Sequence, residues 1–165
     1  MGDQGLIVVG VDGSEPARTA LQFALDEAVR RSARVRAVIA FRPPEYWPVT
    51  SGMAYSPSIE PLVEAAERTV QQTVAEVTAD AERAVPLEAR VVQGNPAKVL
   101  LVQAADADLL VVGHRGPGGF ASMCLGSVVL QCVLHATCPV TVVRPVTRRL
   151  AGGDGRGVQG AVTLG

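Results

Sequence analysis

Residues 109–128 read LLVVGHRGPGGFASMCLGSV, an apolar run followed by a glycine-rich segment. The run Leu109–Val112 is typical of a buried strand, and glycine marks its end. Two residues separate Gly113 from Gly116, and nine more separate Gly116 from Gly126-Ser127, which opens an apolar helical run. The glycines are therefore predicted at the carboxyl end of a strand, opposite the start of a helix.

A strand end of this composition is suited to binding a negatively charged group. Glycine allows close approach because it has no Cβ, and the first N–H groups of a helix lack intrahelical partners. The helix dipole favours an anion at the same point, and Ser127 adds a hydroxyl donor. We interpret the segment as a cradle for nucleotide phosphates. The alternative is that the glycines are ordinary turn residues before an ordinary helix start.

The first strand of the chain ends in a similar way. Leu6–Val11 is a second buried-strand pattern, and it leads directly into Asp12-Gly13-Ser14. In open parallel sheets, ligands bind beyond the carboxyl ends of strands, where a carboxylate can hydrogen-bond a ribose hydroxyl. Asp12 is therefore a candidate ribose ligand if the two strands are neighbours. The alternative is a turn in which Ser14 caps a helix with Pro16 in its first turn.

The rest of the pattern alternates between helices and strands. Helices are predicted at 16–31, 59–84, 97–105 and 126–135, and further strands at 35–41, 87–92 and 139–144. This alternation predicts a single-domain α/β fold with a five-stranded parallel sheet and helices on both faces. Prolines in 42–58 exclude long regular structure there, and its aromatic residues either cover a ligand or pack onto the sheet. We expect one domain at 1–146 and a disordered glycine-rich tail at 147–165.

Composition excludes several classes of function. A net charge of -1 with 19% charged residues does not indicate nucleic-acid or membrane binding. Lys98 is the sole lysine of the sequence, so there is no Walker A motif. With no apolar run of membrane-spanning length and no leader pattern, we expect a cytoplasmic protein. Three cysteines without CxxC spacing, Cys124, Cys132 and Cys138, are interpreted as buried thiols rather than metal ligands.

These motifs resemble those of the universal stress protein family, in its ATP-binding branch. The resemblance covers Leu6 to Pro145 and rests on Val11–Ser14, on Gly113–Gly116 with Gly126-Ser127, and on Cys138–Arg144. It implies a Rossmann-like fold, similar to adenine nucleotide alpha hydrolases, with strand order 3-2-1-4-5. It also implies a set of nucleotide-binding residues, namely Val11, Asp12, Ser14, Ala40, Gly113, Arg115, Gly116, Gly126, Ser127 and Val128.

The same resemblance implies a stress-response module that binds ATP, or AMP or cyclic AMP, without being an enzyme. Mg²⁺ would accompany a triphosphate through the phosphate oxygens, with no metal ligand from the protein. A homodimer through the last strand, Val140 to Arg144, is also implied. The alternatives are a slow ATPase or nucleotidyl-transfer enzyme, and an interaction protein with an AMP- or cyclic AMP-preferring or degenerate site. Pro117 departs from the expected pattern because it has no N–H to donate to a phosphate.

Overall fold

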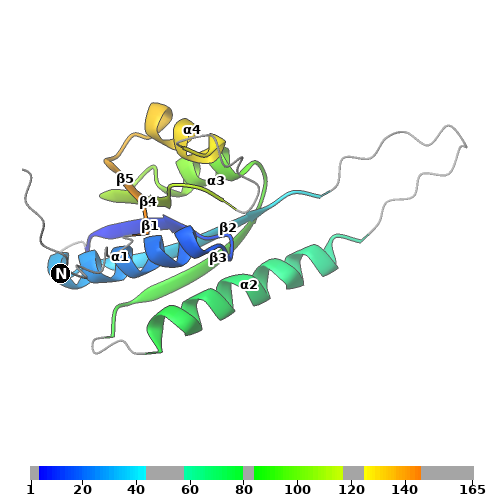
Figure 1. The fold of residues 1–165 in the computed structure, drawn as a ribbon, viewed down its shortest axis with the longest axis horizontal. Coiled ribbons are helices and arrows are strands. Elements are labelled where there is room, and N and C mark those ends of the chain that lie inside the picture. The colour runs from blue at the N-terminus through cyan, green and yellow to red at the C-terminus, as the bar shows by residue number, and fades with distance from the viewer. Residues whose placement is uncertain (1–3, 44–57, 80–83, 117–124, 146–165) are drawn as a thin grey trace, which may run out of the picture.

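The computed structural model describes residues 4–43, 58–79, 84–116 and 125–145, in which strands and helices alternate (Figure 1). The elements are β1 (Leu6–Gly10), α1 (Glu15–Arg31), β2 (Arg34–Phe41), α2 (Glu60–Thr78), β3 (Leu87–Gln93), α3 (Pro96–Gln103), β4 (Leu109–Gly113), α4 (Ser127–His135) and β5 (Val140–Val143). The strands form one parallel sheet in the order β3-β2-β1-β4-β5. This arrangement confirms the predicted α/β class and the strand order.

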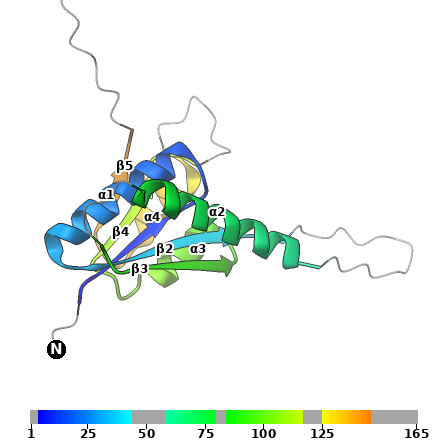
Figure 2. The same ribbon diagram turned by 90° about the horizontal axis from the view of Figure 1, so that it is seen from below.

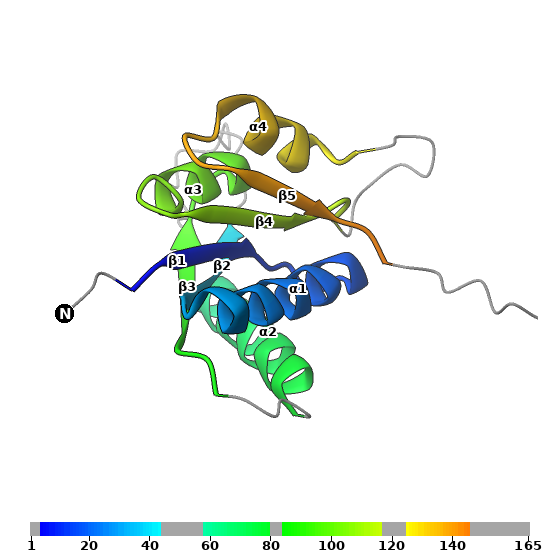
Figure 3. The ribbon, with the colours of Figure 1, turned by 90° about the vertical axis from the view of Figure 1, so that its left-hand side faces the viewer.

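Helices cover both faces of the sheet. Figure 3 shows α1 and α2 on one face and α3 and α4 on the other, and Figure 2 looks onto α1 and α2. The central strands are buried from both sides: Ile7 packs toward α1 and α2, while Val8 and Leu110 pack toward α3 and α4. Such two-sided burial explains why these strands are continuous apolar runs.

Two helices begin at side chains that accept hydrogen bonds from their first N–H groups. The Ser14 hydroxyl accepts from the N–H of Ala17 at 3.3 Å. The side-chain oxygen of Asn95 accepts from the N–H groups of Ala97 and Lys98, at 3.0 and 3.3 Å. Ser, Thr, Asp and Asn at this position satisfy N–H groups that the helix leaves unpaired. A Ser14 cap is one of the two interpretations of this turn given above, and α3 begins at Pro96, one residue before the predicted start at 97.

The helix predicted at 59–84 is shorter in the structure. In the structure α2 ends at Thr78, and Ala84 is not helical. Among the described residues of this helix, Val77 is the last whose side chain packs against the core. The first strand is also one residue shorter than predicted, because β1 ends at Gly10.

Several sequence predictions concern residues outside the described part of the chain. They are the tail at 147–165, most of the proline-rich segment 42–58, and both Pro117 and Cys124. Of the other cysteines, Cys132 is fully buried, and burial raises the pKa of its thiol to about 11. Cys138 is half-buried, and burial raises its pKa too. Within the described residues, no helix is long and apolar enough to cross a membrane.

Candidate functional site

A cavity of about 430 Å³ lies at the carboxyl ends of the central strands. Nine of the ten residues implied as nucleotide ligands line it: Val11, Asp12, Ala40, Gly113, Arg115, Gly116, Gly126, Ser127 and Val128. They come from four places in the sequence, the ends of β1, β2 and β4 and the start of α4. The tenth, Ser14, does not line the cavity.

The position of the cavity follows from the order of the strands. The chain proceeds from β1 outward to β3 in one direction, and then returns to β4 and β5 on the other side of β1. Because Val9 pairs with Val111 in a parallel register, the carboxyl ends of β1 and β4 lie at the same edge of the sheet. Crossover connections leave in opposite directions at such a switch point, and the space between them accepts a ligand.

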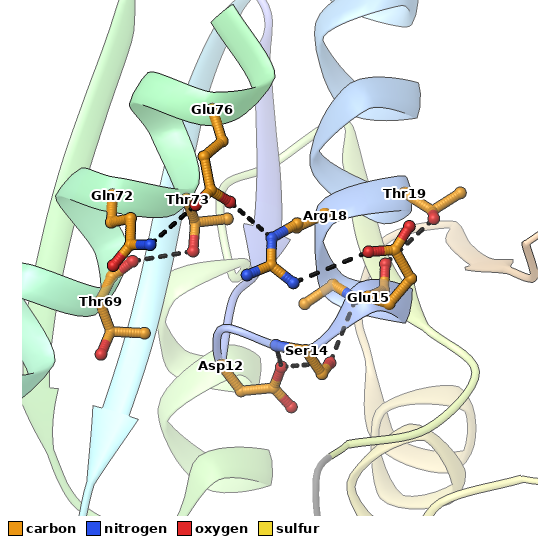
Figure 4. A network of polar contacts seen from close by, with 10 residues as sticks. Asp12, Ser14, Glu15, Arg18, Thr19, Thr69, Gln72, Thr73 and Glu76 are labelled. Carbon is orange, nitrogen blue, oxygen red and sulfur yellow. Dashed lines mark hydrogen bonds and ion pairs between the residues drawn. The ribbon is translucent and has the colours of Figure 1, made fainter.

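The two carboxylate oxygens of Asp12 have different surroundings. Its Oδ1 accepts hydrogen bonds from the Ser14 hydroxyl and from the Ser14 N–H, the latter at 2.9 Å (Figure 4). Its Oδ2 faces the glycine loop, since a Cβ built on Gly116 would lie 2.8 Å from it. Ser14 therefore acts as the helix cap that was considered as an alternative, while Asp12 remains at the cavity with one oxygen toward the ligand space.

The glycine loop is joined to the start of α4 and to β5 by backbone hydrogen bonds. The N–H of Gly126 donates to the carbonyl of His114 at 3.0 Å, and the N–H of His114 donates to the carbonyl of Val143 at 2.9 Å. Gly126 is the residue preceding α4, and no described side chain caps this helix. The helix thus directs N–H groups of its first turn at the cavity, beside Ser127 and Val128.

Gly113 lines the cavity, as predicted for a phosphate-binding residue, and it also serves packing. A Cβ built there would lie 2.6 Å from the carbonyl oxygen of Pro16. Glycine at this position therefore allows the first turn of α1 to pack on the end of β4. By contrast, a Cβ on Gly126 would be no closer than 3.6 Å to its nearest neighbour, the Cα of Arg115.

The remaining wall of the cavity is apolar, and sequence reasoning missed most of it. The added lining residues are Gly10, Ala17, Val38, Pro96, Leu100, Val112 and Val129. A signal was present for Pro96, which follows the strand end of β3 and opens α3. For residues such as Leu100, no local pattern separates a side chain at a cavity from one in the core.

Ala40 offers polar groups within this apolar wall. The last pair of the β1–β2 ladder is Gly10 with Val38, and the N–H of Val11 donates to the carbonyl of Val38 at 2.9 Å. Alternate residues of a strand direct their peptide groups to the same side, so those of Ala40 point past the end of β1. An N–H donor and a C=O acceptor beside apolar side chains suit the polar edge of a flat heterocycle.

The charges around the cavity nearly cancel. In the part of its wall that the structure describes, Asp12 and Arg115 are the two charged side chains. Among the described residues, no group of three or more potential metal ligands occurs.

The Nδ1 atom of His114 is buried without a hydrogen-bond partner in the described part of the chain. The arrangement can hold a heterocycle, a hydroxyl group and an anion side by side.

Comparisons with known proteins give matches along most of the chain. The model of the "Universal stress protein family" matches residues 6–144. A universal stress protein of Mycobacterium tuberculosis is 36% identical over 139 residues, covering 84% of this chain and 48% of that protein. One from Thermus aquaticus is 36% identical over 144 residues, covering 84% of this chain and 97% of that protein.

Among solved structures, a universal stress protein in complex with cAMP superimposes with a TM-score of 0.62. Its sequence is 26% identical, and the match covers 86% of this chain and 98% of that one. The chain spans about half the length of the mycobacterial relatives it matches. It spans nearly the whole length of the relative from Thermus aquaticus.

Proposed function

This chain belongs to the universal stress protein family, and from that premise we propose that it binds ATP or another adenine nucleotide as a cytoplasmic regulatory module. One observation carries the proposal. Asp12 Oδ2, the uncapped start of α4 and the apolar wall beside Ala40 meet in a single cavity at the switch point of the sheet. These are the three kinds of surface that a nucleoside phosphate requires.

Each part of an adenine nucleotide has a counterpart in this cavity. The base would lie against Val38, Leu100 and the peptide groups of Ala40, which provide apolar contact and a donor–acceptor pair. The ribose would place a hydroxyl at Asp12. The phosphates would accept N–H bonds from the first turn of α4. The related protein solved with cAMP supports an adenine ligand in this fold.

The number of phosphates determines whether a metal ion is needed. Asp12 and Arg115 together contribute no net charge, so the described wall does little to neutralise a triphosphate. We propose that ATP enters with Mg²⁺ held by its own phosphate oxygens and by water. AMP and cyclic AMP carry less charge, and their binding should depend little on Mg²⁺.

We further propose that the nucleotide is retained rather than hydrolysed. Phosphoryl transfer requires a group that orients the attacking nucleophile and groups that neutralise the developing charge. Asp12 is the carboxylate of the described wall, and its Oδ1 is already engaged by Ser14. This arrangement favours binding over catalysis.

Calorimetric titration with ATP, AMP and cyclic AMP, with and without Mg²⁺, tests the proposal. Replacing Asp12 by alanine is expected to weaken binding about tenfold or more, the scale of a hydrogen bond to a charged group. Asp26→Ala is a matched control, because Asp26 is also exposed, belongs to α1 and lies outside the cavity. No heat with any of the three nucleotides would refute the proposal, and sustained phosphate release would refute its non-enzymatic part.

The two edge strands of the sheet differ in a way that suggests a partner. The edge at β3 carries exposed Glu88 and Arg90, whose side chains pair at 2.6 Å, and such charges discourage strand addition. The edge strand β5 reads Val140–Val143 without a charge. An uncharged edge of this kind is a ready template for pairing. We propose that two copies of the chain associate through β5.

The hydrogen-bonding pattern of β5 provides a test of this dimer. The carbonyls of Pro139 and Val143 accept from β4, so the N–H of Val142 points away from the sheet. Val142→Pro removes that donor without removing a bond to β4. The variant dimer should dissociate about tenfold more readily in sedimentation experiments, since two symmetric hydrogen bonds are lost. A wild-type chain that sediments as a monomer at high concentration would exclude the dimer.

A further inference from the structure

We infer that Ser14 is a positioning residue that makes the cavity selective for ribose hydroxyl groups, by determining which oxygen of Asp12 meets the ligand. The inference rests on the proposed function, because it concerns how the same cavity recognises a nucleotide. It assigns a role to a residue that does not itself line the cavity.

Ser14 donates two hydrogen bonds to the same oxygen of Asp12. Its backbone N–H and its hydroxyl both donate to Oδ1. The Ser14 oxygen in turn accepts from the N–H of Ala17, so the hydroxyl proton is directed at Asp12 by the first turn of α1. The Oδ2 atom remains the acceptor on the cavity side, next to Gly116.

The turn that carries Asp12 packs against α2 on the side away from the cavity. Gly13 has φ +79°, a conformation that favours glycine, and a Cβ there would lie 2.9 Å from the Cγ2 atom of Thr69 on α2. Close packing of α2 therefore limits movement of the turn away from the cavity. With the backbone confined, the orientation of the carboxylate depends on Ser14.

A bridge between the two helices joins α2 to α1 beside this turn. Figure 4 shows Arg18 of α1 reaching Glu76 of α2, with Nε 2.7 Å from the carboxylate, and Gln72 donating to Glu76 at 2.8 Å. Hydrogen bonds from Gln72 and then from Arg18 hold the pKa of Glu76 below its ordinary value. The same contacts therefore favour the charged form of Glu76.

A carboxylate fixed in this way is already oriented toward a ligand hydroxyl before the ligand binds. A hydroxyl that donates to an ionised oxygen makes a charge-assisted bond, and a preset acceptor avoids the cost of ordering it during binding. If the Ser14 hydroxyl is lost, the backbone N–H of residue 14 is the one donor of this pair left to Oδ1, and the Asp12 carboxylate can turn toward water or toward α1. Ligands with and without ribose hydroxyls should then bind with similar affinity.

Two variants separate this role from helix capping. Aspartate is as good a capping residue as serine, so Ser14→Asp preserves the cap, but its carboxylate cannot donate to Asp12 and repels it. Ser14→Thr keeps both the cap and the donor. Thermal unfolding should give similar melting temperatures for both variants and the wild type. If Ser14→Asp fails to fold, Ser14→Ala is measured instead; it loses both the cap and the donor, so only the ratio of ligand affinities, and not its stability, is compared.

The readout is the ratio of the dissociation constants for 2′,3′-dideoxy-ATP and ATP, measured by calorimetry with saturating Mg²⁺. The wild type and Ser14→Thr should prefer ATP about tenfold, and Ser14→Asp should reduce the ratio to near one. A purely structural role would lower both affinities equally and leave the ratio unchanged. An unchanged ratio in Ser14→Asp, or a wild-type ratio near one, would overturn the inference. If the wild type binds neither nucleotide, the proposed function itself has failed.

Discussion

Replacing Gly116 by alanine is expected to weaken ATP binding about a hundredfold, equivalent to about 2.7 kcal/mol, while the protein stays folded. The new Cβ would lie 2.8 Å from Oδ2 of Asp12, in the space that a ligand hydroxyl must enter. Gly116 is exposed, and its φ lies outside the left-handed range, so alanine imposes no backbone strain. The effect should therefore fall on the ligand rather than on folding.

Calorimetry with ATP measures this loss, and thermal unfolding confirms that the variant is intact. A double variant gives a sharper control. If Gly116→Ala acts by obstructing Asp12, then Asp12→Ala combined with Gly116→Ala should lose less affinity than the sum of the two single losses. Full additivity would show that the two residues act independently. An affinity within twofold of the wild type would contradict the proposed position of the ligand.

The second large effect is expected at Gly113, where alanine should lower the free energy of unfolding by about 3 kcal/mol, as overpacking in a rigid core does. Its Cβ would lie 2.6 Å from the carbonyl oxygen and 2.7 Å from the carbonyl carbon of Pro16. These are backbone atoms in the first turn of α1, so they cannot move aside without displacing the helix from β4.

Gly126→Ala is the matched control, because it changes a glycine of the same motif. The Cβ of that variant would make only ordinary contacts, with the Cα of Arg115 at 3.6 Å and the carbonyl oxygen of His114 at 3.7 Å. Its stability should stay within about 1 kcal/mol of the wild type, the cost of a less favourable residue before a helix. Urea denaturation of the two variants makes the comparison, and equal stabilities would show that Gly113 does not serve packing.

Local patterns predicted the elements well wherever the cause is local. The starts of α1 and α3 were predicted to within one residue because a helix cap acts within three residues along the chain. The end of α2 could not be placed in this way, because no glycine or other local stop signal follows Thr78 directly. The motif residues Asp12 and Gly116 were assigned to one site from their positions after two strands, and the structure brings them together.

The amino-acid sequence by itself determined the order of helices and strands and which segments end at the edge of the sheet where the cavity lies, because periodicity and caps are encoded by neighbouring residues. Only the tertiary structure decided what each motif residue faces. Gly113 meets Pro16, Gly116 meets Asp12, and Ser14 turns from the cavity to hold a carboxylate. Such contacts join residues far apart in the chain or fix a side-chain direction, and both depend on how the strands pair and the helices pack.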